Sequence, residues 1–323
     1  MSVWPSPAVP RPLQQLFDRV PLLTYDANVL PARSQSATSS RLPTLYVFST
    51  DSDARLGAPS YNPGCLKWQT FLKLARVEFQ IVPATNHASP TGALPFLLPA
   101  RPSPSASASA SASPAPAPVS SARLQKYALE HGQHKPAEQT PTLRLDAYQA
   151  LLDVPIRNAW LQALYLEPRH AALLDRLYVA PASSSRWVQA TLRHQLRRAA
   201  EAEILKTSSS AGGSASATPI LVDESAMYAG ARDALDALAD LLAESETDWF
   251  FGAPSPSLFD ASVFAYTHLM RRLLDGGADG EGEDLKIPAR LGALVRAAGT
   301  GELERHQSRL LEMLWPGESL SGR

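Results

Sequence analysis

Pro95 places the tightest constraint on what this chain can fold into. It lies near the start of a short apolar run, ALPFLLPA (residues 93–100), which follows a polar loop with a turn signal at Thr91-Gly92. A proline near the start of a strand removes a ladder hydrogen bond, so such prolines are found at sheet edges, bulges and special turns. The run therefore predicts a strand that begins in one of these settings.

Composition excludes several classes of protein. The chain has 323 residues, 45% of them hydrophobic, which is enough for two ordinary domains. Thirty basic against 31 acidic residues argue against a dedicated nucleic-acid binder. A single cysteine, Cys65, excludes internal disulfides and thiolate metal clusters. We find no apolar run long enough to span a membrane, and we expect the proline-rich N-terminus to be a retained extension rather than a cleaved signal.

The first ordered elements are short strands around one helix. TLYVF (residues 44–48) and FQIVP (residues 79–83) are typical of buried strands, and LPFLL (residues 94–98) predicts a third. Between the first two, Asn62 can cap a helix and Pro63 suits its first position. A right-handed βαβ unit is the natural packing of this order. A further short helix is expected in SSARLQKYALEHG (residues 120–132).

Three segments do not show a packed-core pattern. Residues 1–43 form an N-terminal extension, either a loose tail or a segment that docks on this protein or on a partner. Its candidate contact residues are Leu16, Phe17, Leu22, Leu23 and Tyr25. An Ala/Ser/Pro insert at about 101–118 and a linker at about 207–219 are of low complexity, and we expect both to be flexible.

Beyond Thr142 the apolar spacing is helical throughout, with a kink expected at Pro155. The sequence thus predicts an α/β domain over 44–141, followed by an all-helical domain over 142–323. We expect helices at about 184–206, 223–245, 259–274, 287–298 and 302–314. In PSPSLFDASVFAY (residues 254–266), Ser257 can cap a helix and Asp260 can reach back to its N–H, a variant of the capping box.

These motifs resemble the glutathione-transferase fold, with a thioredoxin-like N-terminal domain and an all-helical C-terminal domain. The resemblance implies that the bond before Pro95 is cis. Within that superfamily, PSYNPGCLKW (residues 59–68), NHASPTGALPFLLP (residues 86–99) and WFFGAPSPSLFDASVFAY (residues 249–266) are most similar to the metaxins. More narrowly, the chain resembles the smaller metaxin-like subunit of the fungal mitochondrial sorting and assembly machinery.

The metaxin resemblance implies a non-enzymatic receptor and assembly subunit without a cofactor. It would lie peripherally on the cytosolic face of the mitochondrial outer membrane. Its partners would be the β-barrel translocase subunit of the machinery, a second metaxin-like subunit and β-barrel precursors, whose β-signal it would recognise. In thioredoxin-like folds the residue before the cis-proline, here Leu94, presents its backbone to an extended peptide, so we expect Leu94 to contact the precursor. The alternative is that Pro95 has a purely structural role in shaping the core and that the loop binds no peptide.

The alternative function is a soluble glutathione-dependent transferase. Such an enzyme needs a Tyr, Ser or Cys near the end of the first strand to stabilise the glutathione thiolate. Ser49, Thr50, Ser60, Tyr61 and Cys65 lie in that region. Transferases also hold glutathione with an acidic-Ser pair at the third helix, where this chain has Ser120-Ser121 and no carboxylate. We therefore expect no catalytic residue.

The histidines and a group of arginines form two further patterns. The seven histidines show no metal-ligand cluster, so no metal site is expected. Arg186, Arg193 and Arg197 lie near one stripe of a predicted helix. Such a stripe is usually a solvated face, and contact with anionic lipid or an acidic partner is the alternative.

Overall fold

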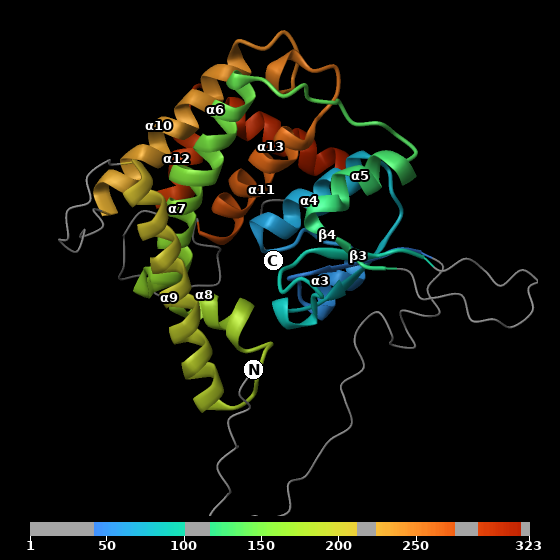
Figure 1. The fold of residues 1–323 in the computed structure, drawn as a ribbon. Helices are drawn as coiled ribbons and strands as arrows, with labels where there is room; N and C mark the ends of the chain where they lie inside the picture. Colours follow the sequence, from blue (N-terminus) through green and yellow to red (C-terminus); the bar gives the residue numbers. More distant parts are fainter. Residues whose placement is uncertain (1–41, 101–116, 212–223, 275–289, 318–323) are drawn as a thin grey trace, which may run out of the picture.

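The computed structural model describes residues 42–100, 117–211, 224–274 and 290–317. Within these ranges a thioredoxin-like sheet and its helices are followed by a helical domain, as the sequence predicted (Figure 1). Several predicted segments lie wholly or mostly outside the described residues. They are the N-terminal extension with Leu16, Phe17, Leu22, Leu23 and Tyr25, most of the 101–118 insert and most of the 207–219 linker.

The described part of the N-terminal domain forms a sheet of four strands in the order β2-β1-β3-β4. β1 pairs parallel to β2, while the β1–β3 and β3–β4 pairs are antiparallel. Its elements are β1 (Thr44–Val47), α3 (Asp51–Leu56), α4 (Pro63–Leu74), β2 (Gln80–Pro83), the 3-10 turn η2 (Asn86–Ala88), β3 (Phe96–Leu98), β4 (Val119–Ser120) and α5 (Ser121–His131). The sequence left the fourth strand unplaced, and it is β4, which pairs with β3.

One helix in this domain was not predicted. Residues 49–61 read as a polar loop, but Asp51–Leu56 form the short helix α3. Thr50 caps it by accepting the Asp53 N–H, and Gly57, with φ 67°, ends it in the left-handed conformation that glycine tolerates. No residue of α3 is buried, so it has no apolar periodicity to reveal it.

The helical domain begins with Thr142 as the cap of α6. Its elements are α6 (Leu143–Leu151), η3 (Leu152–Ile156), α7 (Arg157–Leu161), η4 (Gln162–Leu166), η5 (Pro168–His170), α8 (Ala171–Leu174), η6 (Asp175–Val179), α9 (Arg186–Ala211), α10 (Glu224–Ala243), η7 (Phe250–Gly252), α11 (Leu258–Leu273), α12 (Arg290–Ala297) and α13 (Glu302–Leu314). The interruption expected at Pro155 is a π-helical turn, η3, since proline cannot donate the regular helical bond. The turns between Pro168 and Val179 were not predicted.

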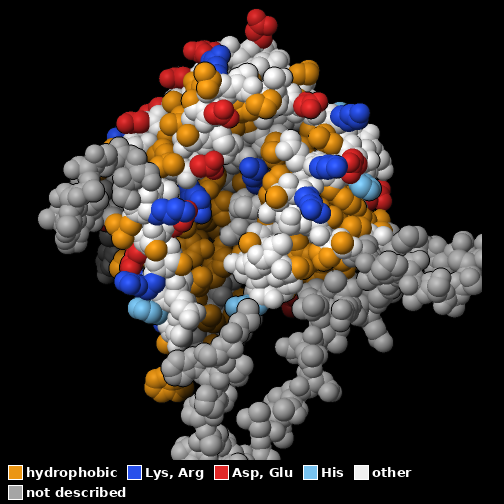
Figure 2. All heavy atoms as spheres, in the orientation of Figure 1, with side chains coloured by type: hydrophobic (Ala, Val, Ile, Leu, Met, Phe, Trp, Pro, Cys, Tyr) orange, Lys and Arg blue, Asp and Glu red, His pale blue; other side chains and the backbone are white. Residues whose placement is uncertain are grey.

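The two domains enclose a hollow. In the space-filling view the part of the molecule that holds α8 and α9 stands apart from the sheet, and hydrophobic side chains line the space between them (Figure 2). The candidate site described below lies where the two domains meet beside β1 and α4.

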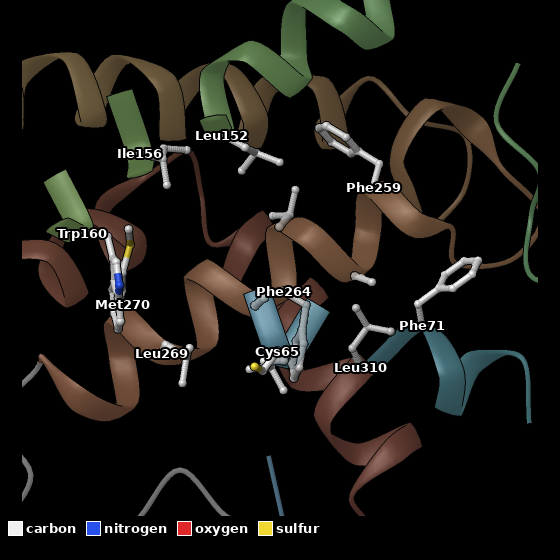
Figure 3. Packing of buried hydrophobic residues seen from close by; sticks show 14 of the residues in the cluster. Cys65, Phe71, Leu152, Ile156, Trp160, Phe259, Phe264, Leu269, Met270 and Leu310 are labelled. Atoms are coloured by element: carbon white, nitrogen blue, oxygen red, sulfur yellow. The ribbon is translucent and has the colours of Figure 1, made fainter. Parts of the chain in front are cut away.

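The core joins the domains through α4 and α11. Cys65 of α4 lies beside Phe264 and Leu269 of α11, and Leu310 of α13 lies between Phe264 and Phe71 of α4 (Figure 3). Ser257 and Asp260 form the predicted capping box at the start of α11. This places a completely buried helix end in the centre of the molecule without leaving its first amides unsatisfied.

Candidate functional site

The loop between β1 and α4 is held by side-chain hydrogen bonds. Asn62 Oδ1 accepts the Cys65 N–H at 3.1 Å, and Pro63 takes the first helical position. The fully buried Ser60 donates its hydroxyl to the Phe48 carbonyl at 2.6 Å, and its N–H donates to Gln69 Oε1 at 2.8 Å. Gln69 Nε2 in turn donates to the Ala58 carbonyl. These bonds fix the loop in which a transferase would carry its thiolate-stabilising group.

The other hydroxyl groups of the loop are also engaged in structural bonds. Ser49 donates to the Thr50 carbonyl at 3.3 Å, and Thr50 caps α3. Tyr61 donates to the Leu177 carbonyl at 2.8 Å, and burial raises the pKa of its phenol. Burial also raises the pKa of the Cys65 thiol, to about 12. A transferase needs a lowered thiol pKa or a free donor at this position, and Ser49, Tyr61 and Cys65 provide neither. Thr50 accepts in its cap, and its hydroxyl shares a 2.9 Å hydrogen bond with Ser52 Oγ.

A cluster of four aromatic side chains packs around this loop, where the two domains meet. Phe48 and Tyr61 of the N-terminal domain meet Tyr165 and Tyr178 of the helical domain. The Tyr61 and Tyr178 rings meet edge to face with centroids 5.3 Å apart, and Asn62 Nδ2 donates to the Tyr178 hydroxyl at 3.2 Å. Tyr178 comes from η6, one of the turns that the sequence did not reveal. The irregular, π-helical geometry there gives no regular period to detect.

The cis-proline loop lies at the end of β1 next to β3. The Leu94–Pro95 bond is cis, as the resemblance implied. The Leu94 N–H, which was expected to face a peptide, donates to Asn86 Oδ1 at 3.1 Å. For that amide to pair with a peptide, its hydrogen bond to Asn86 Oδ1 must therefore break first. At the third helix of the fold, Ser120 is the N-terminal cap residue of α5 and makes no side-chain capping bond.

Next to the loop, a cavity of about 440 Å³ lies between α4, the η3–α7 segment and α11. Polar and aromatic side chains line it, among them Lys67, Trp68, Asp153, Trp160 and Tyr266. Burial lowers the pKa of the Lys67 ammonium, and the nearby Asp153 acts in the opposite direction. A larger cavity, about 660 Å³, lies beside β2 and α3. Both are large enough for a small ligand.

The arginine stripe is partly used inside the protein. Arg193 forms a bidentate ion pair with Asp175, with N···O distances of 2.6 and 2.7 Å. Arg197 donates to the Leu166 carbonyl at 3.3 Å. Arg186 is exposed. Arg193 and Arg197 thus stay partly exposed and also fasten α9 to the preceding turns.

Two absences hold for the described part of the chain. In those ranges no group of three or more His, Cys, Asp or Glu side chains is placed to bind a metal. Within the same ranges, no helix combines the length and the hydropathy that crossing a bilayer requires.

Two family models match the sequence. The glutathione S-transferase N-terminal domain matches residues 63–170, and the glutathione S-transferase C-terminal domain matches residues 231–275. The protein thus has the glutathione-transferase fold, with transferase-like N- and C-terminal domains. The N-terminal match begins at the first residue of α4, so the β1 strand and the loop after it lie outside it.

Similar solved structures include several transferases at low identity. A glutathione S-transferase of Ceriporiopsis subvermispora, in complex with glutathione, is 13% identical with a TM-score of 0.46, over 86% of this chain and 100% of that one. A glutathione transferase of Phanerochaete chrysosporium is 12% identical with a TM-score of 0.47, over 85% of this chain and 99% of that one. No curated protein matches the sequence significantly.

Proposed function

We propose that this chain is a non-enzymatic receptor and assembly subunit of the metaxin type. In this proposal it acts in the mitochondrial sorting and assembly machinery, peripherally on the cytosolic face of the outer membrane. It binds the β-barrel translocase subunit, a second metaxin-like subunit and the β-signal of barrel precursors. The narrower assignment rests on the motif resemblance around Asn62, Asn86 and Asp260, whereas the transferase-like domains are common to many functions.

The main support for a non-enzymatic role comes from how the thiol and hydroxyl groups of the loop after β1 are bonded. The thiol and hydroxyl groups nearest to the transferase position are buried, serve as helix caps or donate to backbone carbonyls. Tyr178 from the helical domain packs against the same loop, and Tyr165 packs against Tyr178. A group that must donate to a bound thiolate cannot also be satisfied inside the fold, since that bond would have to break first.

Precursor recognition is proposed at the cis-proline loop, through the backbone of Leu94. Asn86 Oδ1 now accepts the amide hydrogen bond that an extended peptide would take. Two variants therefore act in opposite directions. Asn86→Ala frees the Leu94 N–H and should tighten the binding of a β-signal peptide, whereas Leu94→Pro removes the donor and should weaken it. Fluorescence anisotropy with a labelled peptide measures both, and circular dichroism checks the fold. Equal affinities for both variants and the wild type would exclude Leu94 as the contact.

A pull-down tests the assembly role directly. Tagged protein is purified from digitonin-solubilised mitochondria, and co-purifying proteins are identified by mass spectrometry. Stoichiometric recovery of an outer-membrane β-barrel translocase with a second metaxin-like protein supports the proposal. Recovery of the protein alone from the soluble fraction refutes it.

The competing function, a glutathione-dependent transferase, is favoured by the two matched family models. Retention on immobilised glutathione distinguishes the two functions, because the receptor should flow through. If the protein is retained, Tyr61→Phe and Ser60→Ala are the first variants to assay, since both hydroxyls lie in the β1–α4 loop.

A further inference from the structure

The free end of α9 exposes the most accessible tryptophan in the described part of the chain. Trp187, in the first turn of α9, is 87% exposed, and the adjacent Val188 is 45% exposed. Single exposed apolar residues are common, but tryptophan is large and is enriched where a protein meets a membrane interface. We call the segment 180–190, which contains both residues, the α9 tip.

Local bonds hold the α9 tip in place. Gln189 Nε2 donates to the Ser183 carbonyl at 2.7 Å, and the Ser185 N–H donates to Ser183 Oγ at 3.2 Å. Further along α9, Arg193 is fixed to Asp175 of η6. The exposed tryptophan is therefore presented on a helix end that is tied back to its own preceding loop and to η6.

The charges around the α9 tip have one sign. Between Arg176 and Ala200 the chain contains five arginines and one histidine and no acidic residue. Arg176 and Arg186 are exposed, and neither has an ion-pair partner among the described residues. The acidic residues nearest in sequence are Asp175, already paired with Arg193, and Glu201, which lies 3.7 Å from Arg198. The tip thus keeps a net positive charge.

The opposite end of the molecule is acidic. Residues 233–248, which include the second half of α10, contain six acidic side chains and no basic one. Figure 2 shows Asp and Glu side chains gathered at the end of the molecule where α10 and α6 lie, far from the free end of α9. An anionic surface would therefore orient the protein with the α9 tip toward it.

We propose that the α9 tip is a membrane contact that inserts Trp187 into the interface of an anionic lipid bilayer, with Arg176 and Arg186 near the headgroups. The positive charge of the tip matches the negative charge of the lipid headgroups. Tryptophan is also the side chain that is enriched at the headgroup level of a bilayer. The inference rests on the proposed function for its location at the outer membrane, and it names the surface that touches the lipid. It requires no contact with the barrel translocase.

Co-sedimentation of the purified full-length protein with vesicles tests the inference. Vesicles of phosphatidylcholine with about one-fifth phosphatidylinositol are compared with phosphatidylcholine alone. The wild type should bind the anionic vesicles, and added salt should weaken the binding. Trp187→Ala should lower the partition coefficient about tenfold, as expected when one large aromatic side chain leaves the interface. Arg186→Gln should weaken binding to the anionic vesicles only.

Leu143→Ala is the matched control, because Leu143 is 89% exposed at the start of α6, at the other end of the molecule. Its vesicle binding should equal that of the wild type. Quenching by lipids brominated in the upper acyl chain gives a second readout. The chain has six tryptophans, so the part of the quenching that is lost in Trp187→Phe measures the insertion of this residue alone.

Two results would overturn the inference. One is unchanged vesicle binding in Trp187→Ala, or an equal loss in Leu143→Ala. The other is normal lipid binding together with lost recovery of a partner protein, which would make the α9 tip a protein contact. Failure of the assembly proposal gives a different result. The pull-down then recovers no translocase, although the protein still binds vesicles normally.

Discussion

Asp260 offers the sharpest test of what holds the helical domain together. Its carboxylate is fully buried and accepts four hydrogen bonds. Oδ1 accepts the Phe250 N–H at 3.1 Å and His306 Nε2 at 3.0 Å, so His306 carries its proton on that nitrogen. Oδ2 accepts the Ser257 N–H at 2.9 Å and the Ser257 hydroxyl at 2.5 Å. One side chain thus links α11, η7 and α13.

The expected loss of stability follows from these bonds. Asp260→Ala removes the acceptor of two buried amides and one imidazole N–H, and each unsatisfied buried donor costs about 1–3 kcal/mol. Partial rehydration of the site recovers some of this, so we expect a loss of about 4 kcal/mol, a large part of the stability of an ordinary protein. Asp260→Asn keeps the shape but turns a donor toward the Ser257 N–H, and should lose about 2 kcal/mol.

Urea unfolding monitored by far-UV circular dichroism measures these values. Tryptophan fluorescence is recorded in parallel, since Trp249, one of six tryptophans, packs edge to face on His306 with centroids 5.9 Å apart. Asp146→Ala is the control, because Asp146 is exposed in the first turn of α6 and its loss should change stability by no more than about 0.5 kcal/mol. The reasoning fails if Asp260→Ala loses less than about 1.5 kcal/mol, or if Asp260→Asn is the more damaging variant.

Three further predictions concern His268, Cys65 and Gly132. The pKa of His268 is lowered to about 3, first by burial and then by Arg272 and Arg271, so the unfolded chain takes up this proton first as the pH falls. Stability should therefore fall by about 1.4 kcal/mol per pH unit below about pH 6.5, and His268→Gln should flatten that slope in urea unfolding at pH 6.5 and 4.5. An unchanged slope would contradict it. Cys65, with its thiol pKa raised to about 12, should react with a maleimide at pH 8 about a thousandfold more slowly in the native protein than in urea. Rapid labelling without loss of structure would count against that burial. Gly132→Ala should cost about 2 kcal/mol, because the new Cβ would lie 2.4 Å from the Ala75 carbonyl oxygen. Gly230→Ala, whose Cβ meets nothing closer than 3.9 Å, should be neutral or stabilising in the same unfolding assay.

Much of the fold could be predicted because its elements carry their own local signals. Asn62 and Pro63 mark the start of α4, and Ser257 and Asp260 mark the start of α11; in each case a few neighbouring residues satisfy the helix end. The missed elements lack such signals. α3 buries no side chain, and η6 has π-helical geometry, which departs from the period of 3.6 residues.

The site was harder to predict because its key contacts are distant in sequence. Leu94 could be located from Pro95, but its hydrogen bond to Asn86 spans a loop of irregular shape. The bond between Tyr61 and the Leu177 carbonyl joins residues 116 positions apart. Nothing near Tyr61 indicates that its hydroxyl is satisfied by the helical domain. The sequence therefore predicted which groups lie in the loop after β1, but not what each of them bonds to.

This difference explains why the motifs define the fold more firmly than the function. Pro95, Ser257 and Asp260 act on backbone geometry and on buried helix ends, so a protein of this fold needs them whether or not it catalyses a reaction. Catalysis would need one free, correctly poised donor beside β1. In this chain Ser60 and Tyr61 donate instead to backbone carbonyls, which fixes the loop and attaches the helical domain to it. Of the two, the Tyr61 hydroxyl stabilises the interface between the two domains.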